Sequence, residues 1–537
     1  MKTIASLFIL CATLALSSAP DITNAADPGI VANGTNQWAK FLEELDSFNP
    51  SGGITEVTIV EPGAGYPLYS TTQNVDVTFE GGGSGASGAT GKAVFAGNGK
   101  LAAISITNRG TGYRVIARQT AGAFPVGSTS ATFQGRPIDG LVTVGMSVDS
   151  TCFLALGGAS AQDQSLSVKV AGQQSPPTWV TVTAVSGMTV TFSHPIAVAA
   201  WYTCFTFGVP RPVLAPDTAF TTPAKVRVVV GEPKILVLSP GVYTAGGFSL
   251  LGKHNLTIMA EGATLVLQDK NLNGVWIEDN CNNITIIGLK IRHSGIVTYE
   301  PASRGTGIGW MVSGYNVKLI NCGAQNIANW AIAVRGPQAY GPYQCNFEFV
   351  NFSASACAGD GFHIGNSVRN VRVTGLSIIN CGDDGFAIYP DQGNDNLPEN
   401  INATGIEVVN NGWRGIFVSG AKKVNISGFL IRGTSGYGIE VSNYNSRPVE
   451  DVSMHGGIVS QVGRTGDGYR PHVSRRYAVV LSNLKRGDFS GILTSEIDEA
   501  LGFEVTNCTG VHIDQGASQI TSSGNTSCTL GSMTALP

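Results

Sequence analysis

One short sequence pattern recurs along the middle of the chain and limits the possible folds more than any other feature. A glycine opens a stretch of alternating apolar residues in GDGFHIG and GDDGFAIY, and the pattern returns in GWRGIFVS and GYGIEVS. The equivalent glycines, Gly361, Gly385, Gly415 and Gly438, lie 24, 30 and 23 residues apart. One strand in each repeat of roughly 20–50 residues is typical of a solenoid, whose coils bury their apolar faces only by stacking. We therefore predict an all-β chain built around a parallel β-helix.

The alternation within each repeat predicts which side chains face the shared core. Successive side chains of a strand point to opposite faces of the sheet. A β-sandwich is the alternative fold, but it would show turn signals every ~8–12 residues. The side chains expected to point inward are Phe362, Ile364, Phe386, Ile388, Ile416, Val418, Ile439 and Val441. Those expected to point outward are His363, Ala387, Phe417 and Glu440.

The whole chain is predicted to comprise five segments. Residues 1–25 have a lysine at position 2, continue with an apolar stretch and end in Thr-Asn-Ala, which is typical of a secretory signal peptide and predicts an extracellular protein. Further on, ITEVTIVEPGAGY returns as LAAISITNRGTGY, and such glycine-closed stretches indicate small β repeats. The other predicted segments are an N-terminal linker at 26–49, an accessory β-repeat domain at 50–137, a small β-sandwich-like domain at 138–212 and the β-helix at 213–537.

The scarcity of charge excludes some classes of protein. Lys and Arg number 33 and Asp and Glu 37 among 537 residues, which gives a net charge of -4. A nucleic-acid binder neutralises phosphates with clustered basic residues, so we expect no nucleic-acid partner. The apolar stretch near the N-terminus is shorter than the ~20 residues that a membrane-spanning helix needs. We therefore expect no membrane insertion.

Charged residues recur at one position of the repeat. The residue before the strand-opening glycine is Asp360, then Asp384, then Arg414, then Tyr437, and Asp383 precedes Asp384. Stacked coils bring equivalent residues within ~4.8 Å, so one patch holds three carboxylates and a guanidinium. Such carboxylates cannot all ionise freely, and one of them could act as an acid. Asp-Gly is also an ordinary turn sequence, which is the alternative explanation. We predict that the three aspartates and Arg414 are catalytic.

These motifs also resemble those of a known family. GDGFHI, followed one coil later by NCGDDGFAI, is similar to the Asn-Thr-Asp-Gly and Gly-Asp-Asp motifs of polygalacturonases, glycoside hydrolase family 28, in the pectin-lyase-like superfamily. The resemblance implies a right-handed parallel β-helix that cleaves pectin-type chains with inversion. It implies that Asp383 is the general acid and that Asp360 and Asp384 activate water. The chain departs from the family at Arg414, where a histidine is expected, and at Glu440-Val441-Ser442, where the family has Arg-Ile-Lys.

The arginine leaves a second enzyme class open. Pectate-lyase-type β-helices bind Ca²⁺ through aspartates and use a basic residue to remove a proton from a uronate. Asp360, Asp383 and Asp384 would then be metal ligands and Arg414 the base. A hydrolase would need no cofactor, so a chelator separates the two. An epimerase of the same fold is expected to carry Asp-Pro-His-Asp, which this chain lacks.

Side chains around the patch predict a polysaccharide partner. The aromatic rings of Tyr299, Trp310 and Tyr437 could pack on sugar rings. His363 and Glu440 point outward beside the aspartates, and His363 could contact substrate or replace the missing histidine. The insertion 462–476 contributes basic residues near the patch, which favours an acidic, uronate-containing polymer; its predicted subsite residues are Arg470, His472 and Arg475. The last alternative is a non-catalytic, tailspike-like adhesin, and the oligomeric state is predicted as monomer or homotrimer.

Overall fold

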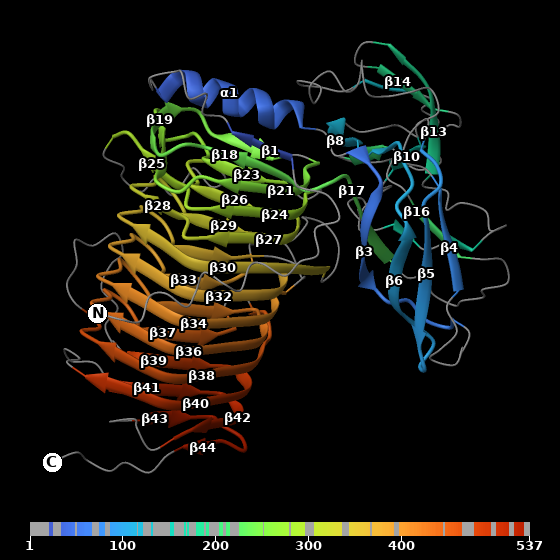
Figure 1. Ribbon diagram of the computed structural model, residues 1–537. Coiled ribbons are helices and arrows are strands. Elements are labelled where there is room, and N and C mark those ends of the chain that lie inside the picture. The colour runs from blue at the N-terminus through green and yellow to red at the C-terminus, as the bar shows by residue number, and fades with distance from the viewer. Residues whose placement is uncertain are drawn as a thin grey trace, which may run out of the picture.

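The computed structural model describes a β-helix, a helix that covers one of its ends, and the strands of an accessory region (Figure 1). The described residues are 21–24, 34–48, 51–66, 75–80, 86–114, 116–121, 130–132, 151–154, 166–167, 169–170, 179–186, 189–192, 203–207, 211–214 and 225–530, the last without 251, 279–280, 296–305, 336–342, 366–367, 391–396, 444–445, 464–476, 496–500 and 515–519. Among these residues, no helix is both long enough and apolar enough to cross a membrane.

Two long parallel sheets form the β-helix, and each coil adds a short strand to the first sheet. The first sheet consists of β20 (Phe248–Leu250), β23 (Val275–Ile277), β26 (Trp310–Val312), β29 (Ile332–Val334), β31 (Phe362–Ile364), β33 (Phe386–Ile388), β35 (Ile416–Ser419), β37 (Ile439–Ser442), β39 (Tyr477–Ser482), β41 (Leu501–Thr506) and β43 (Ile520–Ser523). The register pairs Phe362 with Phe386, Phe386 with Ile416, and Ile416 with Ile439. This is the alignment that the repeat predicts, and it confirms the all-β, parallel β-helix fold.

The second sheet contains the longer strands of the same coils. It consists of β1 (Asp21–Asn24), β18 (Lys234–Val237), β19 (Gly241–Ala245), β21 (His254–Met259), β22 (Ala263–Leu267), β24 (Asn282–Ile287), β25 (Lys290–His293), β27 (Tyr315–Ile320), β28 (Gly323–Gln325), β30 (Tyr343–Ser355), β32 (Val368–Ile379), β34 (Glu399–Val409), β36 (Lys422–Arg432), β38 (Val449–Ser460), β40 (Leu484–Ser495), β42 (Thr509–Ile513) and β44 (Thr529–Leu530). The two sheets enclose one elongated apolar core.

The core confirms the predicted inward side chains. All eight are fully buried, and aromatic rings of neighbouring coils pack edge to face, with the ring centroids of Phe362 and Phe386 5.6 Å apart at an angle of 63°. Burial of one such side chain stabilises a fold by about 1.5–3 kcal/mol, so each coil gains its stability from its neighbours. The glycines before β31, β33, β35 and β37 are required by this close packing. A Cβ on Gly361 would lie 2.4 Å from Cγ2 of Ile378.

Asparagines form a second regular feature on the other sheet, which we call the asparagine ladder: Asn316, Asn346, Asn370 and Asn400. Each residue has a φ between 50° and 60°, a left-handed conformation that asparagine tolerates well. The side-chain amide of each donates to the side-chain oxygen of the residue one coil earlier, over 2.9, 3.1 and 2.6 Å in chain order. The ladder thus satisfies its own polar groups from coil to coil.

A helix covers the N-terminal end of the solenoid, within the segment predicted as a linker. In α1 (Gly34–Ser47), Trp38, Phe41 and Leu45 are buried and belong to the same core as the first coils. The ring centroids of Trp38 and Tyr243 lie 5.8 Å apart. The linker prediction for 26–49 therefore needs correction, because an amphipathic helix closes the apolar end of the core. Strand β1 lies inside the predicted signal peptide 1–25 and pairs with β18.

Strand pairing in the accessory region crosses both predicted domain boundaries. One sheet pairs β3 (Ile54–Glu61) with β17 (Lys225–Val230) and includes β11 (Leu166–Ser167). Another joins β4 (Val75–Glu80), β5 (Thr90–Ala96), β6 (Lys100–Asn108), β12 (Lys169–Val170) and β16 (Arg211–Leu214), and β2 (Ser51–Gly52) pairs with β7 (Tyr113–Arg114). A third contains β8 (Ile116–Ala121), β9 (Ser130–Thr132), β10 (Thr151–Leu154), β13 (Trp179–Ser186), β14 (Thr189–Phe192) and β15 (Thr203–Phe207). The boundaries at 137 and 212 thus divide sheets that the chain forms from distant strands.

Candidate active site

The candidate site lies on the turns that lead into the short strands. In successive coils, the residue two positions before β29, β31, β33, β35 and β37 is Trp330, Asp360, Asp384, Arg414 and Tyr437. The main chain joins these turns: the N–H groups of Gly361 and Gly385 donate to the carbonyls of the next coil at 2.9 and 2.8 Å. We call these five residues the site column. Its order is aromatic, acid, acid, base, aromatic.

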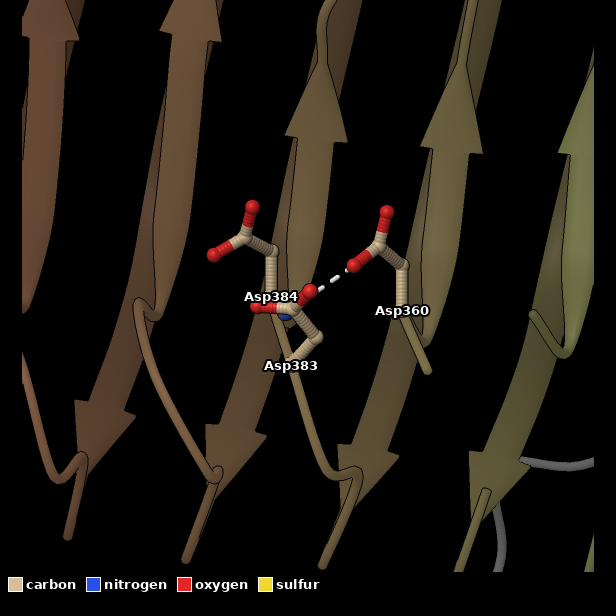
Figure 2. A group of neighbouring side chains, drawn as sticks. All are labelled: Asp360, Asp383 and Asp384. Carbon is tan, nitrogen blue, oxygen red and sulfur yellow. Dashed lines mark hydrogen bonds between the residues drawn. The ribbon is translucent and has the colours of Figure 1, made fainter. Parts of the chain in front are cut away.

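Three carboxyl groups meet in two neighbouring coils. Asp383 and Asp384 are adjacent in one turn and Asp360 lies in the turn before (Figure 2). One oxygen from each lies within 4.8 Å of the others, and the three residues are 4–8% exposed. The backbone N–H of Asp384 donates to Oδ1 of Asp360 over 3.0 Å. The structure therefore brings together the three aspartates that the repeat alignment predicts.

Arg414 makes the strongest charged contacts of the site. Its Nε and Nη2 donate to the two oxygens of Asp384 at 2.6 and 2.7 Å, and its Nη1 donates to Oε2 of Glu440 at 3.0 Å. The centre of the guanidinium lies 3.4 Å from the ring centroid of Phe417. Such a bidentate pair with an aromatic floor fixes both position and orientation. The side chain of Arg414 is only 11% exposed, so these contacts are largely shielded from solvent.

Burial and charge shift the pKa values of this pair. Burial raises the pKa of Asp384 to about 6; Arg414 opposes the rise and Asp360 adds to it. Burial lowers the pKa of Arg414, but the carboxylates of Asp384 and Glu440 outweigh burial and hold it above its usual value. At neutral pH both groups are therefore ionised. Asp384 gains a proton at a pH where an exposed aspartate would still be charged.

His363 is a buried partner of the acid cluster. It is 2% exposed, its Nδ1 lies 2.8 Å from Oδ2 of Asp360, and its ring stacks on Trp330 at 4.5 Å with an interplanar angle of 9°. The outward direction predicted from strand alternation does not make it a surface residue. The aromatic ring of the preceding coil covers it, just as Arg414 covers Phe417.

The other predicted substrate contacts have mixed outcomes. Trp310 needs correction: it is fully buried in the core, and its Nε1 donates to the carbonyl of Gly323 over 3.0 Å, so it cannot contact a sugar. It is the first residue of β26, whose alternation points it inward. Tyr437 and Glu440 are half-buried beside Arg414. The remaining predicted contacts lie outside the described residues: Tyr299, Arg470, His472 and Arg475.

Sequence reasoning missed two aromatic residues beside the cluster. Trp330 and Trp413 are both half-buried, and the ring of Trp413 lies 6.2 Å from that of Tyr437. Trp330 escaped notice because Ala331 stands where later coils have the strand-opening glycine. Trp413 directly precedes Arg414, and nothing in the repeat pattern marks it as a contact residue. With them, partly exposed aromatic rings lie at both ends of the acid cluster.

The carboxylates are also the described residues that could share a divalent cation. The donor set fits a resident Ca²⁺ poorly. Both oxygens of Asp384 already accept hydrogen bonds from Arg414, whose positive charge lies against the cluster. Ca²⁺ takes six to eight oxygen ligands and gains from their negative charge, so a guanidinium in that position opposes binding.

Comparison with known proteins yields structural neighbours only. No protein-family model matches the chain, and no curated protein matches it. Among solved structures, the A-module of mannuronan C-5 epimerase AlgE6 from Azotobacter vinelandii is similar at 15% identity and a TM-score of 0.37, over 55% of this chain and 90% of that one. The hyperthermoactive exopolygalacturonase from Thermotoga maritima has 11% identity and a TM-score of 0.32, over 55% and 84%.

A third neighbour is the enzymatically active domain of tailspike protein 2 from bacteriophage CBA120. It has 13% identity and a TM-score of 0.38, over 54% of this chain. This chain spans 48% of that domain.

Proposed function

We propose that this protein is a polysaccharide-cleaving glycoside hydrolase that works at Asp360, Asp383 and Asp384. The observation that carries the proposal is the site column, in which buried carboxyl groups lie between partly exposed aromatic rings. Hydrolysis of a glycosidic bond needs one carboxyl group that gives a proton and another that activates water or attacks. Aromatic faces on either side suit the C–H faces of a sugar chain.

The contacts suggest how the roles divide. Asp384 is held as a carboxylate by Arg414, and Asp360 accepts from the N–H of Asp384 and lies against His363. Both are thereby oriented as proton acceptors for a water molecule. We assign the role of general acid to Asp383, because its carboxyl group lies beside those of Asp360 and Asp384 and a hydrolase needs a proton donor next to its base.

The alternative of a Ca²⁺-dependent lyase is less well supported. It requires Arg414 to lose a proton, whereas Asp384 and Glu440 hold its pKa above the usual value. An arginine fixed between two carboxylates serves better to orient them than to remove a proton from a sugar. We therefore place Arg414 as the residue that positions Asp384.

The test is the release of reducing ends from a panel of acidic and neutral polysaccharides. We expect Asp383→Asn to lower turnover by about 10²–10⁴-fold while the protein still binds the polymer, because only the proton donor is lost. Asp488→Asn, a half-buried carboxylate on the other sheet, is the matched control and should retain activity. A chelator should leave the activity unchanged. Unsaturated products would instead establish a lyase, and binding without turnover by the unaltered protein would establish an adhesin.

Secretion and oligomeric state remain proposals. The signal peptide 1–25 is proposed from its sequence, although β1 within it pairs with β18. N-terminal sequencing of the mature protein tests it, since cleavage after Ala25 would remove that strand. Sedimentation would distinguish the predicted monomer from the homotrimer.

A further inference from the structure

We infer that the sugar bound at the Arg414 coil carries no carboxylate, so that the enzyme cleaves next to a neutral sugar whatever charges the polymer carries elsewhere. The inference rests on the proposed function and names the substrate class of the same site. It concerns one sugar position, the one beside Arg414 and Glu440.

The charge balance of the site is the first argument. The described side chains around the cluster include four carboxyl groups, those of Asp360, Asp383, Asp384 and Glu440. Arg414 is the guanidinium that contacts them, and it is shared between Asp384 and Glu440. Counting both His363 and Arg335, whose guanidinium lies 5.4 Å from the ring centroid of Trp330, as cations still leaves four carboxyl groups against three positive charges. A further carboxylate brought in by a uronate would add to an existing excess of negative charge.

The second argument is that Glu440 cannot move away. It lies in the middle of β37 on the outer face, and its side chain is 15% exposed. Oε2 accepts from Arg414 over 3.0 Å and Oε1 accepts from the hydroxyl of Ser442 over 2.8 Å. Both oxygens are thus fixed, and a sugar at this coil meets a carboxylate held in place. An anionic sugar is disfavoured there, whereas a hydroxyl group could donate to Glu440.

The third argument is that the partly exposed surface beside Arg414 is aromatic. Trp413 and Tyr437 belong to consecutive coils, with their rings 6.2 Å apart at 59°, and both are half-buried. Trp413 directly precedes Arg414 in its turn, and Tyr437 occupies the position of Arg414 in the next coil. Aromatic faces gain by contact with apolar C–H groups and give no compensation for a buried anion. The surface beside the fixed carboxylate therefore suits an uncharged pyranose.

This conclusion is compatible with an acidic polymer. The basic residues that favour such a polymer belong to the insertion 462–476, and its residues 464–476 lie outside the described residues. They enter the chain between β38 and β39, one coil beyond Glu440. A substrate with uronates at some positions and a neutral sugar at the Arg414 coil would satisfy both features.

The experiment compares each of two polyuronates with its own uncharged derivative. The probes are an α-1,4-galacturonan and a mannuronan, each with the neutral polymer obtained from it by carboxyl reduction, which preserves length and linkage. Binding is measured by affinity electrophoresis and cleavage by reducing ends. The variants are Glu440→Gln, which removes the charge and keeps the shape, and Glu504→Gln, a half-buried glutamate at the equivalent position two coils on.

We expect at least one reduced polymer to bind about tenfold more tightly than its parent, the size of one neighbouring charge at a partly solvated distance. In Glu440→Gln, the ratio of the two affinities should fall to about threefold or less. In the unaltered protein, added salt should also lower this ratio. Glu504→Gln should leave it as it was. Equal or tighter binding of the parent polyuronates, or equal effects of the two variants, would overturn the inference.

The same data separate this inference from the proposed function. Tighter binding of the reduced polymers without any release of reducing ends would contradict hydrolysis but support the inference of a neutral sugar at the Arg414 coil. Cleavage with a preference for the parent polyuronates would contradict the selectivity alone. Failure to bind any of the four polymers would overturn the inference.

Discussion

The asparagine ladder and the site column are both stacks of polar residues on one solenoid, yet they are built in opposite ways. In the ladder, the same residue type repeats and each amide satisfies the next, as between Asn370 and Asn346. In the site column, the residue changes at each coil and the groups cannot satisfy one another without Arg414. A polar residue repeated in every coil thus stabilises the stack through hydrogen bonds between its own side chains. A change of residue within a register of identical turns marks the place where chemistry is expected.

The largest expected effect comes from removing the cation of the site column. Arg414→Ala leaves Asp384 and Glu440 buried without their partner, which should lower the free energy of unfolding by about 3–5 kcal/mol. Thermal unfolding followed by circular dichroism measures the change. Arg432→Ala, an exposed arginine on β36, is the matched control, with an expected loss of about 0–1 kcal/mol. A similar decrease in the free energy of unfolding for both variants would show that the ion pairs of Arg414 stabilise the fold no more than the contacts of an exposed arginine.

The next effect is a pH dependence that the ladder cannot have. Folding raises the pKa of Asp384 from its usual 3.8 to about 6, so the folded state binds this proton more tightly than the unfolded chain. The contribution of Asp384 to the free energy of unfolding should therefore increase as the pH falls from 7 to 4, by about 2 kcal/mol. Activity should fall over the same range, because Asp384 is needed as a carboxylate.

Asp384→Asn provides the comparison for this pH dependence. Unfolding midpoints of both proteins are measured between pH 4 and pH 7. The difference between them should change with pH in the stated direction. Parallel curves would mean that Asp384 titrates as an exposed carboxyl group does.

The smallest expected effect concerns the ladder itself. Asn370→Gly keeps the left-handed backbone, with its φ of 60°, and removes the hydrogen bonds to Asn346 and from Asn400. We expect a loss of about 1–2 kcal/mol, the net value of two such bonds. Asn346→Gly should cost about the same, and neither variant should alter turnover. Unequal decreases in the free energy of unfolding, or a loss of activity, would contradict the view that the ladder contributes only to stability.

The site column was largely predictable because stacking is one-dimensional. Once Gly361, Gly385, Gly415 and Gly438 are aligned, the register places Asp360, Asp384 and Arg414 one coil apart without further knowledge of the structure. What the alignment could not supply is burial. His363 follows the predicted outward direction and is still covered, because a ring from the neighbouring coil lies on it.

The errors have equally local causes. Trp310 is predicted to pack on a sugar because it follows Tyr299 closely in sequence, whereas it begins β26 and points into the core. Trp330 was missed because alanine replaces the glycine that marks the repeat. The accessory boundaries at 137 and 212 depended on neighbouring strands, but antiparallel pairing there joins β3 to β17 across more than a hundred residues. Sequence patterns of short range do not contain such pairings.

Helix α1 has a consequence for how the protein behaves at high concentration. A stack of parallel coils has no intrinsic end, and an open terminal coil offers both apolar surface and unpaired backbone groups to another chain. Trp38, Phe41 and Leu45 occupy that apolar surface at the N-terminal end. The helix therefore caps the end of the solenoid and blocks end-to-end association with another molecule. A protein shortened past α1 is expected to form filaments end to end, although its interior coils are unchanged.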